Sequence, residues 1–317
     1  MNKISVGISA CLLGAEVRHD GGHKRSHFCT DSLSRYFDLR PLCPELGAGF
    51  SVPRPAMRLV EPTDLDKPAR LTISRTGRDV DEPIRNWCQR TVPQLGSLRG
   101  YVLMGKSPSC GLERVRTYNG EGNVQRRDAA GIFASELINA YPILPVEEEG
   151  RLNDPNLREN FIERVFVFDD WCQLIETSLT PAKLIHFHSR RKFQLLAHCE
   201  KTYRQLGVLL SDLKSTPLEN IADQYICAFM LAMKKPAMRG AHANVMLHLL
   251  GFFRGQLESV ERDAIQQSIH NYLHDQVPLV VPMTLLRIAE RRFPNQYLHQ
   301  QAYLAPYPDA LGLRNAI

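Results

Sequence analysis

Hydrophobic residues follow two different rhythms along this chain. Up to about residue 150, short β-branched runs alternate with polar stretches that are compatible with helices. The pattern predicts strands at 71–73 and 141–146 and helices at 83–90 and 131–140. Strands that alternate with helices favour a mostly parallel sheet covered on both faces. We therefore expect residues 1–155 to form a doubly wound, Rossmann-like α/β domain.

The rhythm changes after a segment rich in charge, glycine and proline at 147–155. From Thr180 onward, apolar residues recur every three or four positions, as helices require. Thr180 and Pro181 are typical of an N-cap and the first helical position, and the helix that they begin is expected to continue to Leu206 and stop at Gly207. Further helices are predicted at 218–235, 241–254, 258–274 and 283–292. Residues 165–317 are therefore predicted to form an all-α domain.

Composition agrees with an ordinary two-domain enzyme. With 317 residues, 44% of them hydrophobic and 23% charged, the chain can bury a sizeable core and divide into two domains. No apolar stretch approaches the ~20 residues that a membrane-spanning helix needs. The segment from Met1 to Gly7 enters a strand-like run without the pattern of a secretory signal. We expect a cytoplasmic protein with no membrane partner.

Three of the eight cysteines, Cys11, Cys43 and Cys110, stand where a short apolar run gives way to glycine, proline or serine. Because segments that leave the carboxyl ends of neighbouring parallel strands converge on one crevice, the three thiols are expected to meet there. Cysteines in helical or aromatic surroundings are interpreted as small buried side chains, namely Cys88, Cys172, Cys199 and Cys227. Cys29 stays undecided, and the lack of any Cys-x-x-Cys pair in the sequence disfavours a zinc ribbon.

Three thiolates at one crevice leave a metal centre with a free coordination position, which is typical of catalytic sites. With zinc, a water molecule would complete the site. With a cubane iron-sulfur cluster, three irons would have cysteine ligands and the fourth would be accessible. Both centres are soft and suit a sulfur-bearing substrate.

Polar residues close to these cysteines offer acid-base and binding groups. Glu45, two positions after Cys43, is a candidate general base or acid. Candidates for contact with a ligand flank Cys110 or belong to a polar loop after Cys11, and they are Lys106, Ser107, Ser109 and Asp20. Taken singly, each is more often a cap or turn residue. Their coincidence at three strand ends favours the functional interpretation.

Positive charge is concentrated in the helical half. The net charge is +5, and the segment 183–204 carries the same excess, because six bases face the single acid Glu200. The six bases are Lys183, Arg190, Arg191, Lys192, Lys201 and Arg204. On one helix, four of them would share an arc of about 60° with aromatic residues interleaved. A solvated face explains such an arc, but phosphate-binding bases beside stacking rings also suit RNA.

Several motifs, in order, resemble those of the thiouracil desulfidase family. They are Cys11-Leu12-Leu13-Gly14, Arg18-His19-Asp20-Gly21, Cys43-Pro44-Glu45, Pro53-Arg54-Pro55, Gly77-Arg78-Asp79-Val80 and Lys106-Ser107-Pro108-Ser109-Cys110-Gly111. The resemblance covers residues 1 to about 150. From about residue 165, the chain resembles the helical domain often fused to such desulfidases, through His188, Lys192, His198, Tyr203, and the runs 242–245 and 306–315. The arrangement is similar to that of fused enzymes proposed to remove sulfur from 4-thiouridine in tRNA.

The resemblance implies a [4Fe-4S] cluster held by Cys11, Cys43 and Cys110, with Glu45 and Ser107 as catalytic residues. Val17 stands where many relatives carry another cysteine, which implies an open iron. The implied reaction replaces a carbon-sulfur double bond by carbon-oxygen and gives uridine and hydrosulfide without net electron transfer. Two alternatives remain: the same chemistry on free thiouracil-type bases, and a zinc-containing RNA-binding module without catalysis.

Overall fold

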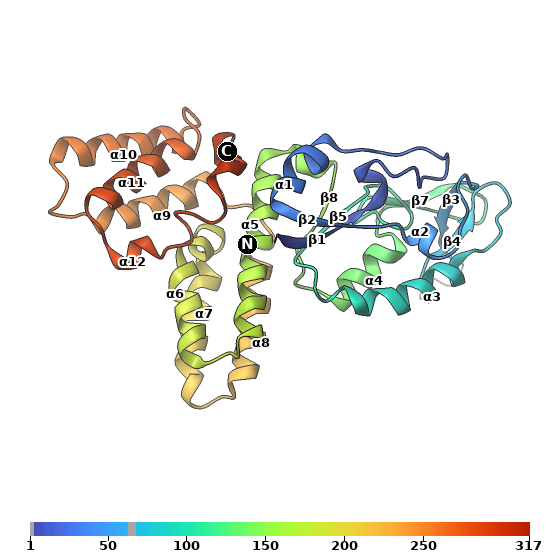
Figure 1. Ribbon diagram of the computed structural model, residues 1–317, viewed down its shortest axis with the longest axis horizontal. Coiled ribbons are helices and arrows are strands. Elements are labelled where there is room, and N and C mark those ends of the chain that lie inside the picture. Colours follow the sequence, from blue (N-terminus) through green and yellow to red (C-terminus); the bar gives the residue numbers. More distant parts are fainter. Residues whose placement is uncertain (1–2, 63–67) are drawn as a thin grey trace. The chain divides into compact units, whose positions relative to one another are not determined.

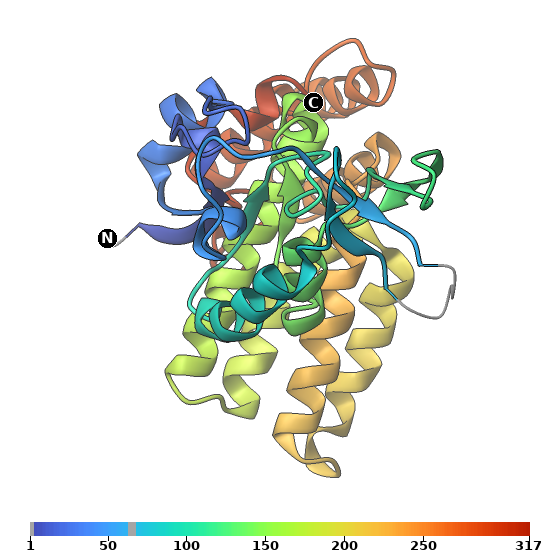
Figure 2. The same cartoon turned by 90° about the vertical axis from the view of Figure 1, so that its right-hand side faces the viewer.

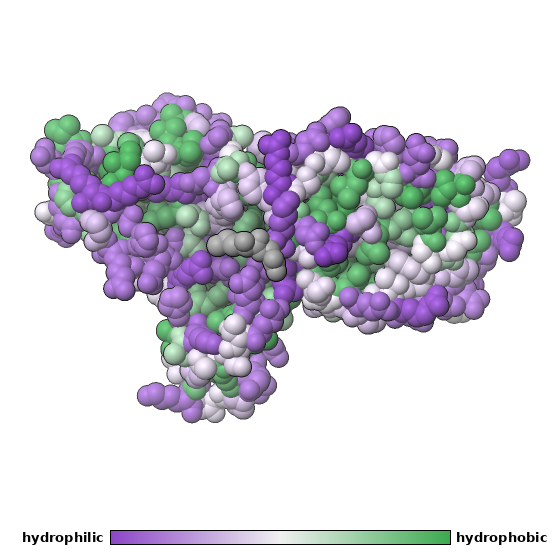
Figure 3. Space-filling view, viewed as in Figure 1, coloured by the Kyte–Doolittle hydropathy of each residue, from purple (hydrophilic) through white to green (hydrophobic). Residues whose placement is uncertain are grey.

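The computed structural model describes residues 3–62 and 68–317. The chain divides into two compact units, Met1–Asn153 and Asp154–Ile317. The first unit is α/β and the second is all-α (Figure 1), which confirms the predicted fold class. Each unit buries its own apolar residues, and hydrophilic residues cover much of the surface seen in Figure 3.

The first unit is built on a parallel sheet of four strands. The strands are β1 (Ile4–Ser9), β2 (Phe37–Leu42), β5 (Tyr101–Leu103) and β8 (Val146–Glu148), in the order β2-β1-β5-β8. All three neighbouring pairs are parallel, and Val6, Ile8 and Val102 are fully buried, as is typical of a covered parallel sheet. The strand predicted at 141–146 is wrong in its bounds, because prolines at 142 and 145 cannot donate to a ladder.

Short helices cover this sheet. Of these, α3 (Asp81–Thr91) and α4 (Ile132–Ala140) pack against each other and bury Ile84, Cys88, Phe133 and Leu137. In Figure 1, α1 (Ser34–Tyr36) lies on the other side of the strands from α3 and α4, and α2 (Pro44–Gly47) follows β2. The loops contain short 3-10 or π turns at Ala10–Leu13, Phe28–Leu33, Val92–Leu95 and Arg151–Asn153.

A second sheet, which the sequence patterns do not predict, completes the first unit. It consists of β3 (Met57–Val60), β4 (Arg70–Ile73), β6 (Val115–Tyr118) and β7 (Val124–Ala129), in the order β4-β3-β6-β7. The central pair β3 and β6 is parallel, and the two outer pairs are antiparallel. Figure 2 shows this sheet facing the viewer, with the hairpin of β6 and β7 in green.

Two acids of the charged segment 147–155, Glu147 and Glu148, lie in β8. Glu148 is fully buried, and its carboxylate accepts hydrogen bonds from the backbone N–H of Leu112 at 2.9 Å and from Arg114 at 2.5 Å. Glu147 accepts a hydrogen bond from Arg151 at 2.7 Å. A buried carboxylate is tolerated where it is paired in this way. The local sequence does not show the partners that allow these two acids to be buried.

The second unit contains helices at the predicted positions from residue 181 onward, together with α5 and α12, which were not predicted. They are α5 (Pro155–Glu176), α6 (Pro181–His198), α7 (Glu200–Leu209), α8 (Leu218–Ala232), α9 (Arg239–Gly251), α10 (Ser259–Leu273), α11 (Val280–Arg292) and α12 (Gln296–His299), with 3-10 turns at Leu210–Lys214, Asp309–Leu311 and Leu313–Asn315. Asp154 caps α5 by accepting hydrogen bonds from the N–H groups of Asn156 at 2.9 Å and Leu157 at 3.0 Å. The helical unit therefore begins before the predicted residue 165.

The single helix predicted from Thr180 to Leu206 is wrong, because the structure divides it into α6 and α7. The backbone of Cys199 is extended, with φ −156° and ψ 99°. His198, the last residue of α6, is hydrogen-bonded through its ring to the carbonyl of Lys235 at 2.7 Å and to Glu163 at 3.0 Å. These tertiary contacts fix the end of α6, and helical periodicity does not report them.

Two groups of buried side chains stabilise the helical unit. One is a cluster of rings from α5, α6 and α8, made of Trp171, Phe187, Tyr225 and Phe229. The other is formed mainly by α9, α10 and α11 and includes Met246, Ile269 and Leu286. No helix in the described ranges has the length and apolar composition needed to cross a lipid bilayer.

Candidate active site

The topology of the first sheet brings three chain segments to one edge. In the sheet, β1 has β2 on one side and β5 on the other. After β2, the chain therefore crosses to the opposite side of β1 to form β5. Such a switch point opens a crevice at the carboxyl ends of the strands. Cys11 follows β1, Cys43 follows β2, and Cys110 lies in the loop after β5.

A cavity of about 390 Å³ occupies this edge, and all three thiols line it. Glu45, Ser107 and Lys106 also line it, together with residues to which the sequence analysis assigned no role, chiefly Ser9, Arg18, His19 and Arg54. The volume lies within the range of small-molecule sites, about 300–1,000 Å³. The structure therefore brings together the three cysteines and the two residues that the family resemblance implies to be catalytic.

Cys11 and Cys110 are buried and Cys43 is half-buried, and the three thiols lie within electrostatic range of one another. Burial raises the pKa of Cys11 to about 11, and the neighbouring Cys43 adds to this effect. Burial also raises the pKa of Cys43 and takes the pKa of Cys110 well above its ordinary value, although a hydrogen bond with Ser9 opposes it. Thiols of this kind are protonated at neutral pH until a soft metal displaces their protons.

Tyr101, at the start of β5, also lies within electrostatic range of the three thiols. Burial raises the pKa of its hydroxyl well above the ordinary value, and Cys110, Cys43 and Cys11 each contribute in the same direction. Within the described residues, no group of three or more His, Cys, Asp or Glu side chains is arranged to hold a single metal ion.

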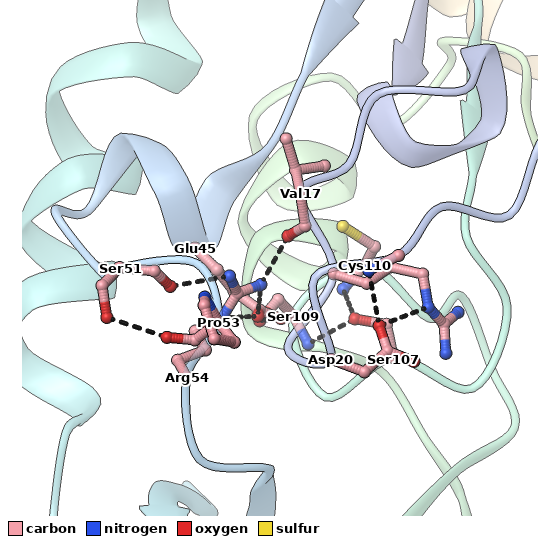
Figure 4. A network of polar contacts seen from close by, with 11 residues as sticks. Val17, Asp20, Glu45, Ser51, Pro53, Arg54, Ser107, Ser109 and Cys110 are labelled. Carbon is pink, nitrogen blue, oxygen red and sulfur yellow. Dashed lines mark hydrogen bonds and ion pairs between the residues drawn. The ribbon is translucent and has the colours of Figure 1, made fainter.

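The carboxylate of Glu45 is held from two sides (Figure 4). Arg54 donates to Oε2 of Glu45 from Nε, at 2.8 Å, and from Nη2. Ser109 donates from its hydroxyl to Oε1 at 2.8 Å. Arg54 is itself fixed, because it also donates to the carbonyls of Val17 at 2.9 Å and Ser51 at 3.2 Å. The side chains of Arg54 and Glu45 are only 5% and 13% exposed, so this ion pair is shielded from solvent.

The loop before Cys110 is closely packed. The hydroxyl of Ser107 accepts hydrogen bonds from the N–H groups of Ser109 at 3.2 Å and Cys110 at 3.1 Å. A Cβ on Gly131 would lie 2.5 Å from the carbonyl carbon of Ser109, and one on Gly111 would lie 2.9 Å from the carbonyl oxygen of Ser107. Glycine at these two positions lets the loop and the start of α4 approach closely. Ser107 keeps its own hydroxyl proton available to a ligand.

The other predicted ligand-binding residues have different positions. Lys106 lines the cavity, with its backbone in the left-handed region at φ 62°. Ser109 is fully buried and contacts Glu45, and it does not line the cavity. Asp20 is 54% exposed, accepts a hydrogen bond from the N–H of Gly22 at 3.1 Å and is not among the lining residues. The polar loop reaches the cavity through its neighbours instead.

Arg54 is the residue of this network that sequence reasoning missed. It belongs to the quoted motif Pro53-Arg54-Pro55, which was the available signal. A proline on each side of an arginine does not show that its partner is Glu45, nine positions earlier.

The predicted basic arc of the helical unit is not a continuous free surface. The arc assumed one helix, whereas Lys201 and Arg204 lie on α7, beyond the break at Cys199. Arg191 is 2% exposed and donates to Asp170, so its placement on an RNA-binding surface is wrong. Four other bases also have partners within the chain. Arg190 pairs with Asp170 at 3.2 Å, Arg204 pairs with Glu200 at 2.5 Å, Lys183 donates to the carbonyl of Thr177 at 2.6 Å, and Lys192 lies over the ring of Tyr297 at 4.9 Å.

The remaining cysteines lie away from the cavity lining. Cys29 and Cys88 are buried, Cys172 and Cys199 are half-buried, and Cys227 is exposed. The interpretation as a small buried side chain is therefore confirmed for Cys88 and wrong for Cys227. Cys227 follows the buried Ile226 in α8 and lies on the exposed face of this helix.

Two family models match parts of this chain. Residues 6–149 match the family model described as 2-thiouracil desulfurase, and residues 192–308 match the model described as a protein of unknown function, DUF1722. The uncharacterized protein YbgA of Escherichia coli (strain K12) is 28% identical over 166 residues, which are 52% of this chain and 98% of that protein. The uncharacterized protein YbbK of Bacillus subtilis (strain 168) is 28% identical over 155 residues, 46% of this chain and 97% of that protein.

One solved structure is similar in sequence to part of this chain. It is described as the [4Fe-4S]-dependent thiouracil desulfidase TudS, is 28% identical, and covers 48% of this chain and 94% of its own, with a TM-score of 0.38.

Proposed function

We propose that this protein hydrolytically removes sulfur from 4-thiouridine in tRNA, with a [4Fe-4S] cluster as cofactor, because residues 6–149 match the family model described as 2-thiouracil desulfurase. Uridine and hydrosulfide are the products. The observation that carries the proposal is that Cys11, Cys43 and Cys110, from the ends of three adjacent parallel strands, all line one cavity with Glu45. A tRNA substrate places the reaction in the cytoplasm.

The donor set fits such a cluster. Iron-sulfur clusters are held by cysteine thiolates, and three thiols within electrostatic range of one another, two buried and one half-buried, line this cavity. Three cysteines leave one of four irons without a protein ligand. When bound, the cluster supplies a Lewis acid with affinity for the thiocarbonyl sulfur.

The chain's own residues supply the proton transfers and the positioning. Water adds to the carbon that carries sulfur, the carbon-sulfur bond breaks, and sulfur leaves as hydrosulfide with no net oxidation. Glu45 takes a proton from the attacking water and returns it to the departing group. Ser107 donates a hydrogen bond that orients the uracil ring, and Lys106 adds positive charge at the rim.

Arg54 acts through Glu45 and is a positioning residue. Its guanidinium holds one carboxylate oxygen, while Ser109 holds the other. The orientation of Glu45 toward the cavity therefore depends on two residues that do not contact the substrate.

Nucleoside analysis distinguishes this function from its alternatives. Anaerobically purified protein is incubated with 4-thiouridine-containing tRNA and, separately, with free 4-thiouracil. We expect loss of 4-thiouridine and an equal gain of uridine in the tRNA. Conversion of the free base alone would instead support a desulfidase of free thiouracil bases. Conversion of neither substrate by protein that contains zinc and no iron would support an RNA-binding module without catalysis.

A further inference from the structure

A second hollow, rich in arginine, adjoins the active-site cavity in the first unit. Its volume is about 530 Å³, and its basic lining residues are Arg58, Lys106, Arg114, Arg116 and Arg127. We call these five residues, with Tyr118, the basic hollow. Its lining contains no acidic residue among those that the structure describes. It shares Met57, Lys106 and Pro108 with the cavity of the three thiols, so the two spaces are neighbours.

Strand alternation explains why the bases gather there. Along β6, the exposed Arg116 and half-buried Tyr118 alternate with the buried Val115 and Thr117, because successive side chains point to opposite faces. Strand β6 pairs with β3 on one side and β7 on the other. Arg58 from β3 and Arg127 from β7 therefore join Arg116 on the same side of the sheet.

Most of these charges are not neutralised. In the part of the chain that the structure describes, no ion pair involves Arg58, Arg116 or Arg127. Arg114 alone pairs, with Glu148 at 2.5 Å. The Nε of Arg58 is buried and lacks a hydrogen-bond partner. A surface that serves only solubility usually mixes both signs, so this one is suited to a polyanion.

Arg126, the neighbour of Arg127 on β7, shows the contrast. It pairs with Asp128 at 3.0 Å and lines a different hollow, which also contains Glu61 and Asp128. Adjacent residues of one strand thus differ in both face and partner. This makes Arg126 a matched control for Arg127.

An aromatic ring lies among the bases. The guanidinium of Arg58 is 5.2 Å from the centre of the Tyr118 ring. Arginines that hold phosphates beside a ring that stacks on bases are the features that bind single-stranded nucleic acid. The positive φ of Lys106 is costly for a residue with a side chain, and Lys106 stands where the two spaces meet.

We propose that the basic hollow binds the phosphates of unpaired RNA nucleotides next to the thiolated base, and so guides that base into the cavity of the three thiols. The inference rests on the proposed function and assigns its RNA contact to the second sheet. The helical arc is less suited, because its arginines already pair with Asp170 and Glu200.

The test compares the double variant Arg116→Gln/Arg127→Gln with Arg126→Gln. Fluorescence anisotropy measures the binding of an unmodified single-stranded RNA oligonucleotide over a series of salt concentrations. Each phosphate contact contributes about 0.7 to the slope of log Kd against log salt, so loss of two contacts is expected to reduce the slope by about 1.4. Arg126→Gln should keep the wild-type slope. Arg116→Lys/Arg127→Lys, which retains both charges, should also restore most of it.

Equal slopes for the double variant and Arg126→Gln would overturn the inference. A competition experiment gives a second contradicting outcome. If polyglutamate of equal charge displaces the labelled RNA at the same concentration as unlabelled RNA does, the result indicates an acidic protein partner. The readout uses unmodified RNA and does not depend on turnover. Desulfuration by the wild type together with an unchanged slope in the double variant would therefore remove the basic hollow and leave the proposed function. A reduced slope in the double variant, together with no desulfuration by the wild type, would instead support the basic hollow and remove the proposed function.

Discussion

At the scale of single residues, the orientation of the Glu45 carboxylate is fixed by contacts from other parts of the first unit. Arg54 and Ser109 each hold one of its carboxylate oxygens, and Val17 and Ser51 hold Arg54 in turn. Two N–H groups of one planar guanidinium, both donating to Oε2 of Glu45, fix the direction of that oxygen more firmly than an ammonium group does. The geometry of proton transfer should therefore depend on Arg54 even though the reacting atoms do not touch it.

We expect Arg54→Gln to lower kcat by about 10- to 100-fold, since a misplaced catalytic group costs roughly that much, with little change in KM or iron content. Arg54→Lys should recover part of kcat, because it restores the charge without the fork. Arg40→Gln, which removes an exposed pair with Asp38, is the control and should behave as wild type. Loss of iron in Arg54→Gln would show a structural role and contradict positioning.

The residues that sequence reasoning found and missed differ in one respect. Cys11, Cys43 and Cys110 each end a local apolar run, so their meeting follows from the topology of parallel strands. Arg54 and Asp20 belong to loops, and a loop's sequence does not state which side chain faces a cavity. The structure places Arg54 in the lining and Asp20 outside it.

At the scale of elements, short strands and helix ends were the least predictable. Strands β3 and β6 have four residues each and pair across more than fifty positions of sequence, so neither shows a long alternating pattern. The division between α6 and α7 depends on His198, whose buried ring contacts Glu163 and Lys235. The positions of α8, α9, α10 and α11 were predicted to within a few residues, because their periodicity is local.

The pair of His198 and Glu163 predicts how stability varies with pH. Burial alone would lower the pKa of His198, but the hydrogen bond and charge of Glu163 outweigh it and raise this pKa. Burial alone would raise the pKa of Glu163, but His198 lowers it to about 2. The stability that His198 contributes is thus complete below its unfolded pKa of about 6.5 and is lost as pH rises through the raised folded pKa.

We therefore expect the free energy of unfolding to fall as pH rises above about 6.5. Glu159 acts in the same direction over a lower range, between its ordinary pKa of 4.5 and its folded pKa, because burial and then Glu163 raise this pKa to about 7. His198→Gln should cost about 3 kcal/mol at pH 6, since it leaves a buried carboxylate without its partner, and should flatten the curve. Urea unfolding followed by helical circular dichroism measures both effects.

His186→Gln serves as the control in this series, because His186 is an exposed histidine on the same helix. It should reproduce the wild-type dependence on pH. Stability that rises between pH 6.5 and 9, or a His198→Gln variant with the wild-type slope, would contradict the assignment of the pair.

At the scale of the whole molecule, the two hydrophobic rhythms of the sequence correspond to two compact units. The distribution of charge could not be read in the same way. The segment 183–204 has an excess of bases in sequence, yet Asp170, on another helix, pairs with two of them. The bases of the second sheet are scattered from residue 58 to residue 127 and gather only in the fold. Spatial charge therefore depends on pairing and topology that local counting does not include.

The central claim is that Cys11, Cys43 and Cys110 hold an iron-sulfur cluster in the cavity that they line. The most direct measurement is the content of iron and acid-labile sulfide in anaerobically purified protein and in Cys11→Ala, Cys43→Ala and Cys110→Ala, with the exposed Cys227→Ala as control. We expect about four irons and four sulfides per chain in the wild type and control, and loss of both, with loss of desulfuration, in each of the three variants. Undiminished iron and sulfide in all three variants would contradict the claim.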